Sequence, residues 1–223
     1  MSYHRYRRRE ELSLPSVAFT LFLSVAVPLA MILTLGQQLG QVLQVYGVLT
    51  SLSWLALYFF KRDWLEFKSV SLLTAVVNVA VMLLSGSFAA QLAAQKSPFV
   101  IVPLTLSSVV PIVEVNFVTI TLAFMVGWAE EMLYGGVLYG TLQKTGIWGK
   151  LITAAVFAFM HIKAYTSVSP FDPAFLHDPR AYLLLAPFIT RFVQCYLIDY
   201  EKGIVGVALG HGLGDALLMI RAG

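Results

Sequence analysis

Residues 70–94 read VSLLTAVVNVAVMLLSGSFAAQLAA, and no charged side chain interrupts them. A helix needs about 20 mainly apolar residues to cross the hydrocarbon core of a bilayer, which is roughly 30 Å thick. This stretch meets that length. The composition of the whole chain agrees, because 58% of its residues are hydrophobic and only 12% are charged, whereas roughly a quarter of the residues in soluble proteins are charged. The sequence therefore predicts an integral membrane protein.

The same criterion predicts an all-α fold, a polytopic bundle of about seven transmembrane helices in one membrane domain over residues 15–223. The other predicted spans are residues 15–35, 42–60, 116–142, 147–165, 181–198 and 203–220. Residues 99–113 are also apolar, but Pro98, Pro103 and Pro111 remove backbone donors there. We expect a broken or re-entrant segment at this point, with an eighth crossing as the alternative.

Positive charges predict the orientation of the bundle. Residues 1–14 are polar, lack a cleavage pattern for a signal peptide and contain Arg5, Arg7, Arg8 and Arg9. We therefore expect this segment to stay on the chain and to face the cytoplasm, with residues 61–68 in a second cytoplasmic loop. A prokaryotic cytoplasmic membrane is the expected location. Orientation and contact with anionic membrane lipids explain the net charge of +3, so no nucleic-acid partner is expected.

A small set of ionisable side chains lies inside the late predicted spans. Each costs from ~3 to more than 10 kcal/mol at the centre of a bilayer, and such residues usually mark a functional site. A single one could be explained by a hydrogen bond between helices, but several together favour a site. The set consists of Glu130, Glu131, His161, Arg191, His211 and Asp215.

These residues can share one depth in the membrane. Glu130 and His161 lie equally far from the turn that joins their two spans, so antiparallel helices would place them at the same level. Asp215 follows His211 by one helical turn on the same face. Glycines surround both ends of the set and permit either close helix packing or room for an extended substrate; they are Gly135, Gly136, Gly206, Gly210, Gly212 and Gly214.

Glutamate, histidine and aspartate in a dry pocket suit amide hydrolysis without a covalent intermediate. A buried glutamate can take a proton from water and return it to a leaving amine, while a histidine donates to the developing oxyanion. Histidine and carboxylate could instead hold zinc or iron. The sequence contains no H-E-x-x-H pair and no other compact ligand spacing. We therefore expect no metal and no other cofactor.

Three motifs in this order resemble the CPBP family of intramembrane proteases, named for CAAX proteases and bacteriocin-processing enzymes and also called Abi proteins. They are EEMLYGG at residues 130–136, FAFMH at 157–161 and HGLGD at 211–215. The resemblance covers about residues 116–220 and implies a metal-independent glutamic endopeptidase. It implies that Glu130 and His161 activate water, that His211 stabilises the oxyanion, and that Glu131 and Phe157 support the site. The implied substrates are membrane-associated proteins or peptides, prenylated proteins among them.

The chain departs from the family pattern at two positions. The pattern has an arginine four residues after the second glutamate, where this chain has Gly135, and an asparagine four residues after the last histidine, where it has Asp215. An unpaired buried carboxylate is unfavourable, and aspartate cannot donate a hydrogen bond unless it is protonated. We expect Arg191 to replace the missing arginine as the counterion of Glu131 or Asp215, and Asp215 to be protonated in a site of low dielectric constant.

Two further functions stay open beside an intramembrane endopeptidase. The missing arginine and asparagine favour an inactive homologue that serves as a scaffold, assembly factor or subunit of a membrane protein complex. A metal-dependent transporter or hydrolase is a more distant alternative.

Overall fold

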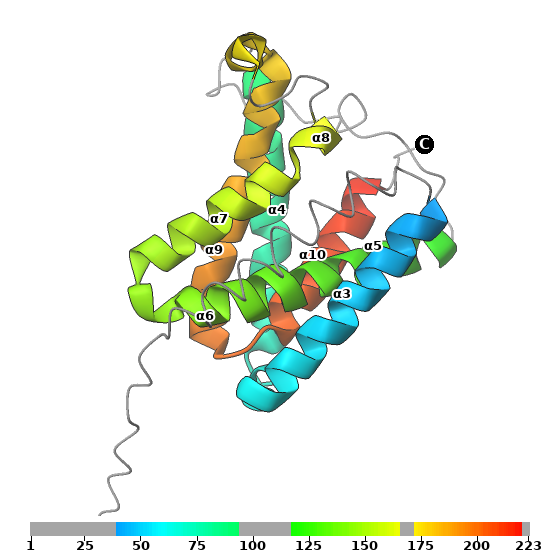
Figure 1. Ribbon diagram of the computed structural model, residues 1–223, viewed down its shortest axis with the longest axis vertical. Coiled ribbons are helices and arrows are strands. Elements are labelled where there is room, and N and C mark those ends of the chain that lie inside the picture. The colour runs from blue at the N-terminus through cyan, green and yellow to red at the C-terminus, as the bar shows by residue number, and fades with distance from the viewer. Residues whose placement is uncertain (1–38, 94–116, 166–171, 220–223) are drawn as a thin grey trace, which may run out of the picture.

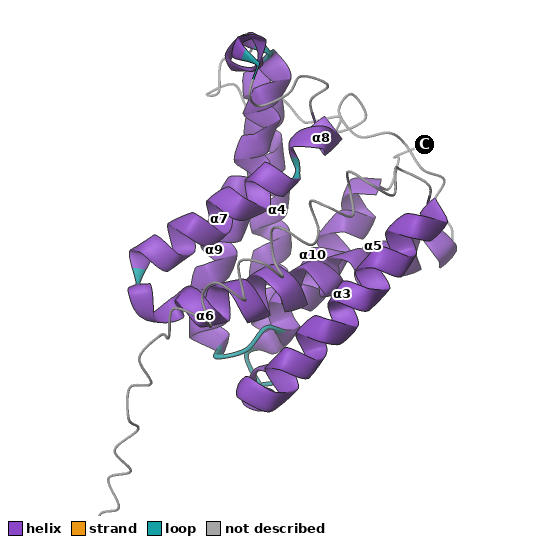
Figure 2. Cartoon of the chain, viewed as in Figure 1, coloured by secondary structure: helices purple, strands orange, loops and turns teal. Residues whose placement is uncertain are grey.

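A computed structural model describes residues 39–93, 117–165 and 172–219, and every regular element in these ranges is a helix (Figures 1 and 2). The predicted all-α class is therefore confirmed. The longer helices are α3 (Leu39–Phe60), α4 (Ser71–Ala93), α5 (Phe117–Glu130), α7 (Ile147–Met160), α9 (Leu185–Glu201) and α10 (Val205–Met219). The shorter elements are η2 (Arg62–Leu65), η4 (Glu131–Tyr139), α6 (Gly140–Leu142), η5 (Gln143–Thr145), α8 (Ile162–Tyr165), η6 (Pro173–His177) and η7 (Pro179–Leu184).

Two helical stretches in the described ranges are long and apolar enough to cross a membrane: α4, and η7 with α9 as one run from Pro179 to Glu201. The predicted number of seven spans is not confirmed. α7 and α10 are apolar but have only 14 and 15 residues, and α5 continues into a π-helical segment, η4, instead of one long α-helix. The predictions for residues 1–14, 15–35 and 99–113 lie outside the described residues.

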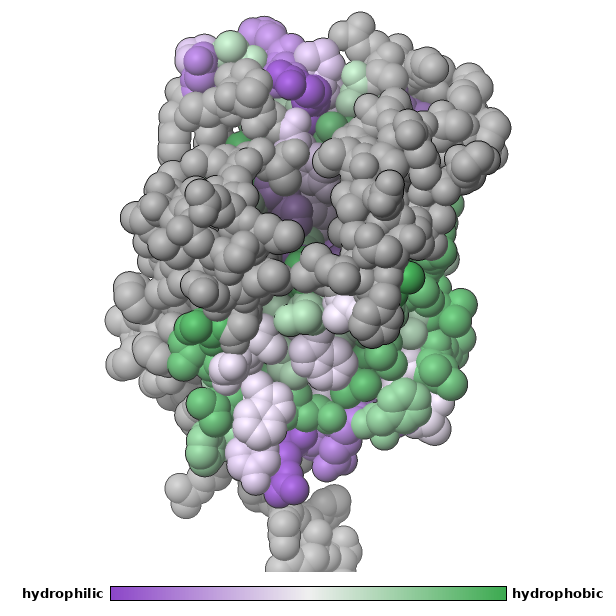
Figure 3. All heavy atoms as spheres, turned by 90° about the vertical axis from the view of Figure 1, so that its right-hand side faces the viewer, coloured by the Kyte–Doolittle hydropathy of each residue, from purple (hydrophilic) through white to green (hydrophobic). Residues whose placement is uncertain are grey.

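Large apolar side chains cover the outward faces of the helices. Phe59 on α3 is 74% exposed, and Leu84 on α4 is 71% exposed. Figure 3 shows hydrophobic side chains along the flanks of the molecule and hydrophilic ones toward its upper and lower ends. Water would penalise such a surface, whereas lipid accepts it, so these faces fit helices in a bilayer.

Helix α10 packs closely between α4 and α5 because glycines lie on both of its contact faces. A Cβ atom on Gly210 would lie 2.5 Å from the carbonyl oxygen of Ala75 on α4. On the other face, a Cβ atom on Gly212 would lie 2.6 Å from the Phe124 ring on α5. These glycines therefore serve close packing of backbones, which is the first of the two roles expected from the sequence.

Three buried polar contacts run along the seam between α4 and α9. The hydroxyl groups of Ser85 and Thr190 lie 2.6 Å apart, and Ser71 Oγ donates to Glu201 Oε1 over 2.5 Å. Between them, Gln194 Nε2 donates to Asn78 Oδ1 over 3.1 Å. The α4 members recur every seven residues, the repeat that keeps one face of a helix against a partner. These contacts fix the register of α9, the helix that carries Arg191.

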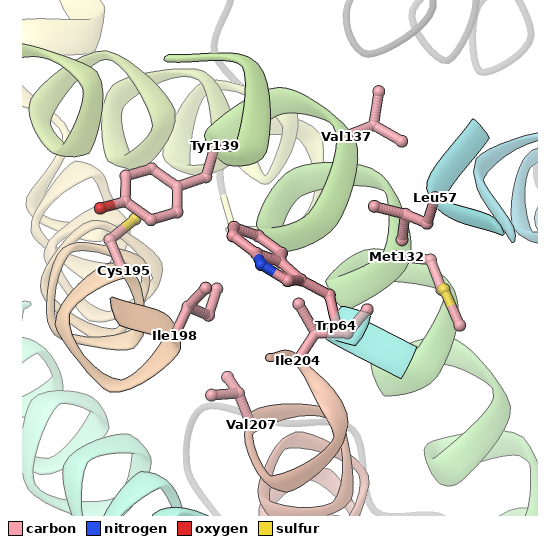
Figure 4. Packing of buried hydrophobic residues seen from close by; sticks show 9 residues of the cluster. All are labelled: Leu57, Trp64, Met132, Val137, Tyr139, Cys195, Ile198, Ile204 and Val207. Carbon is pink, nitrogen blue, oxygen red and sulfur yellow. The ribbon is translucent and has the colours of Figure 1, made fainter. Parts of the chain in front are cut away.

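An apolar cluster ties η4 to the helices beside it. Figure 4 shows Trp64, from η2, among side chains from α3, η4, α9 and the start of α10. Met132, Val137 and Tyr139 of η4 belong to this cluster, and so does Ile198 of α9. Between helices in a bilayer, such contacts contribute through van der Waals packing. The segment that begins with Glu131 is therefore held against α9 and α10.

Candidate active site

Glu131, the first residue of η4, lies at the centre of the site. Its side chain is fully buried, as is that of Arg191 from α9. Arg191 donates two hydrogen bonds to it, from Nη1 to Oε2 over 2.6 Å and from Nη2 to Oε1 over 2.8 Å. This two-pronged geometry is the strongest pairing available between arginine and a carboxylate. The expected pairing of Arg191 is confirmed, and Glu131 is the carboxylate that it holds.

Gly135 is part of the same arrangement. A Cβ atom on this residue would lie 2.7 Å from Glu131 Oε2 and 3.3 Å from Arg191 Nη1. A side chain at position 135 would therefore collide with the pair. The glycine at the position of the family's arginine and the arginine at position 191 belong together, because the first leaves the space that the guanidinium of the second occupies.

His211 from α10 connects Glu131 with two further carboxylates. Its Nδ1 lies 2.7 Å from Glu131 Oε1, and since a carboxylate only accepts hydrogen bonds when ionised, Nδ1 is the donor. On the other side of the ring, Nε2 lies 3.6 Å from Glu130 Oε2 and 3.7 Å from Asp215 Oδ2. Glu130 and His211 are both buried. A proton on Nε2 would thus face two acidic groups.

His161 joins this group through the ring of Phe157. The Phe157 ring centroid lies 4.5 Å from that of His161 and 6.2 Å from that of His211. The guanidinium of Arg191 lies over the same ring at 4.2 Å. Phe157, which the sequence predicts as a supporting residue, therefore lies near both histidines and against the guanidinium of the ion pair.

The hydrogen bond of His161 sets which of its nitrogens is basic. His161 Nδ1 lies 2.8 Å from the carbonyl oxygen of Phe157. A carbonyl oxygen only accepts, so the proton of a neutral ring is on Nδ1 and the lone pair is on Nε2. His161 is also less deeply buried than His211. Its Nε2 can therefore accept a hydrogen bond or a proton.

Two tyrosines that the sequence analysis did not select also border the site. Tyr134 is buried and presents its ring at 5.2 Å to that of Phe157. Tyr165 stacks on His161 with ring centroids 6.2 Å apart. Each follows a selected residue by four positions, Tyr134 after Glu130 and Tyr165 after His161. A search for partners one helical turn away would have found them.

The described residues contain no group of three or more His, Cys, Asp or Glu side chains placed to hold a metal ion.

A second ionic cluster, here called the Lys150 cluster, contains Lys150, Tyr139, Asp199, Gln143 and Lys61. Lys150 donates to Tyr139 and to Asp199. Asp199 also accepts from the Tyr139 hydroxyl and from Gln143 Nε2, each over 2.7 Å, and Gln143 in turn accepts from Lys61 over 3.0 Å. It connects η4, η5, α7 and α9 with Lys61, the residue between α3 and η2. The Asp199 side chain is 35% exposed.

Residues 112–217 match the family model described as type II CAAX prenyl endopeptidase Rce1-like. Comparison with curated proteins and with solved structures finds no match. Every site residue predicted from the sequence lies within the matched range.

Proposed function

We propose, on the premise that the chain belongs to the CPBP family through its Rce1-like residues 112–217, that this membrane protein is a glutamic intramembrane endopeptidase. It hydrolyses a peptide bond of a membrane-associated protein or peptide. The reaction uses water that is activated by Glu130 and His161.

The observation that carries this proposal is the pairing of Arg191 with Glu131. The loss of the family's arginine at position 135 is the strongest argument for an inactive homologue. Arg191 supplies the same kind of charge to Glu131 from a different helix, over 2.6 and 2.8 Å. Because Glu131 also binds His211, this counterion supports the orientation of a catalytic histidine as well as the charge balance of the site.

The proposed reaction starts with a water molecule beside Glu130 and His161. Glu130 accepts a proton from the water, His161 Nε2 accepts its hydrogen bond, and the water oxygen attacks the carbonyl carbon of the peptide bond. His211 Nε2 donates to the oxyanion that forms. Glu130 then returns its proton to the leaving amine as the carbon–nitrogen bond breaks. Arg191 and Glu131 hold His211 in place throughout.

Asp215 has a defined part in this scheme. It lies 3.7 Å from His211 Nε2, at the position where the family has asparagine. A protonated Asp215 can donate to the oxyanion as an asparagine amide would. Replacement by asparagine is then expected to preserve turnover.

The substrate class follows from the family. The matched model is named for CAAX prenyl endopeptidases, so a peptide with a prenylated cysteine near its C-terminus is the first substrate to test. A lipid anchor would hold such a peptide at the depth of the site, which raises its local concentration.

The direct test is cleavage in reconstituted vesicles. Purified protein would be mixed with a membrane-anchored, fluorogenic prenyl peptide, and turnover would be measured for the native chain and for Glu130→Gln. The matched control is Glu66→Gln, since Glu66 is exposed and lies outside the site. We expect loss of turnover in Glu130→Gln alone. Equal turnover in Glu130→Gln and the native chain would refute the glutamic mechanism. If no prenylated or peptide substrate were cleaved, the result would favour an inactive homologue.

A further inference from the structure

Asn78 on α4 makes two buried hydrogen bonds to two different helices. Its side chain is fully buried. Nδ2 donates to the carbonyl oxygen of Val207 on α10 over 2.8 Å, and Oδ1 accepts from Gln194 Nε2 on α9 over 3.1 Å. Asn78 lies outside the range that matches the family.

The two helices that Asn78 joins carry the two partners of Glu131. Val207 precedes His211 by one helical turn, and Gln194 follows Arg191 by about one turn. The amide of Asn78 therefore contacts α10 and α9 about one helical turn from the residues that bind the Glu131 carboxylate. A change in the spacing of α9 and α10 at this level would move Arg191 and His211 relative to one another.

Asn78 lies where α4 and α10 pack tightly. Gly210, one residue before His211, brings α10 so close to α4 that a Cβ atom on it would lie 2.8 Å from Asn78 Cβ. Asn78 thus lies at a close approach of the two helices. Hydrogen bonds between membrane helices contribute little to stability on average, so we expect these two bonds to affect geometry more than folding.

We propose that Asn78 is a positioning residue of the active site, which sets the register of α9 against α10 so that Arg191 and His211 reach the same carboxylate. Its kinetic consequence rests on the proposed function, whereas its effect on the geometry of His211 does not. The first half of the chain therefore takes part in the chemistry of the second half.

The test compares Asn78→Leu and Gln194→Leu with Thr74→Val as matched control. Thr74 is a buried polar residue one turn away on α4, but its hydroxyl donates to the carbonyl oxygen of Val70, the residue just before the same helix. The first readout is the pair of imidazole ¹⁵N signals of His211 in lipid nanodiscs, identified by their loss in His211→Gln. The second is kcat and KM for the prenyl peptide.

We expect Asn78→Leu and Gln194→Leu to shift the His211 signals and to lower kcat by about 10- to 100-fold, the effect of misplacing reacting groups by about 1 Å. KM should stay within about two-fold, and the double variant should be no worse than Asn78→Leu. Thr74→Val should change neither readout.

Unchanged His211 signals in both leucine variants, or equal shifts in Thr74→Val, would overturn the proposal. Gln194→Leu keeps the bond from Asn78 to Val207, so it gives an answer even if Asn78→Leu does not fold. If the native chain cleaves nothing while the His211 signals shift as expected, the proposed function fails and the positioning role of Asn78 stands.

Discussion

The Glu131 site and the Lys150 cluster are both built from charges that α9 brings against the segment from Glu130 to Gln143, yet they differ in charge balance. In the Lys150 cluster, one carboxylate, Asp199, receives hydrogen bonds from Lys150, Tyr139 and Gln143. In the site, Glu130, Glu131 and Asp215 share one guanidinium and one imidazole.

This difference in charge balance suits the Lys150 cluster to a structural role and the Glu131 site to catalysis. Asp199 accepts hydrogen bonds from a lysine, a phenol and an amide, and these bonds hold the helices in place. In the site, three carboxylates lie around one guanidinium and one imidazole, so groups that can donate and accept protons lie side by side. Such a cluster can accept and return protons, as hydrolysis requires.

The largest expected effect comes from removing the counterion in the site. Arg191→Met leaves the buried Glu131 without its arginine and should lower the free energy of unfolding by about 3–5 kcal/mol. Unfolding by denaturant in detergent micelles measures this. Arg180→Met is the control, because the Arg180 side chain is 55% exposed and lies outside the site. Adding Glu131→Gln to Arg191→Met should recover much of the loss. An Arg191→Met protein as stable as the native chain would show that Glu131 does not depend on Arg191 as its counterion.

The next effect concerns the close packing that brings His211 to Glu131. Gly210→Ala places a Cβ atom 2.5 Å from the Ala75 carbonyl oxygen, and such overpacking should cost about 1–3 kcal/mol. Gly86→Ala on α4 is the matched control, because nothing lies within 4 Å of its Cβ position. It should raise stability by about 0.5–1 kcal/mol. Equal effects of the two substitutions would mean that α10 does not depend on this contact.

A smaller effect is expected in the Lys150 cluster. Lys150→Met removes the cation from Asp199, but the Asp199 side chain is 35% exposed, so water can replace part of the interaction. The loss of stability should be about 1 kcal/mol, and peptidase turnover should be unchanged. Loss of turnover without loss of stability would show that the two clusters are coupled and that their separation into structure and chemistry is wrong.

Asp215→Asn is expected to have the smallest effect. It removes one carboxylate from the site and supplies an amide donor where Asp215 faces His211. Stability should change by no more than about 1 kcal/mol, and kcat should be retained or raised. The kcat of this variant against the native chain is the measurement. A large fall in kcat would show that the carboxyl group itself has a role that an amide cannot fill.

The sequence predicted much of the fold because long apolar stretches determine helix positions. Residues 70–94 were predicted as a span, and α4 runs from Ser71 to Ala93. The number of spans was not confirmed, because the helices in the second half of the chain are interrupted. A change from α- to π-helical hydrogen bonding at Glu131 leaves no mark in hydropathy. π-helical segments occur often at functional sites.

The candidate site was predicted from the cost of burying charges, and its geometry was not. That cost selects Glu131, His211 and Arg191, since each needs a partner inside a span. It does not select Gly135 or Asn78, whose importance depends on how two helices are rotated against each other. When a helix is apolar on all sides, periodicity no longer indicates which face meets a neighbour.

The most direct test of the central claim is made in cells. Membrane protein termini would be compared by mass spectrometry in cells with the native gene, with Glu130→Gln and with a deletion. If Glu130 activates the water, one cleavage product disappears in both altered strains, and that product identifies the substrate. If Glu130→Gln instead restores every product and every phenotype that the deletion removes, the protein does not act as a glutamic peptidase.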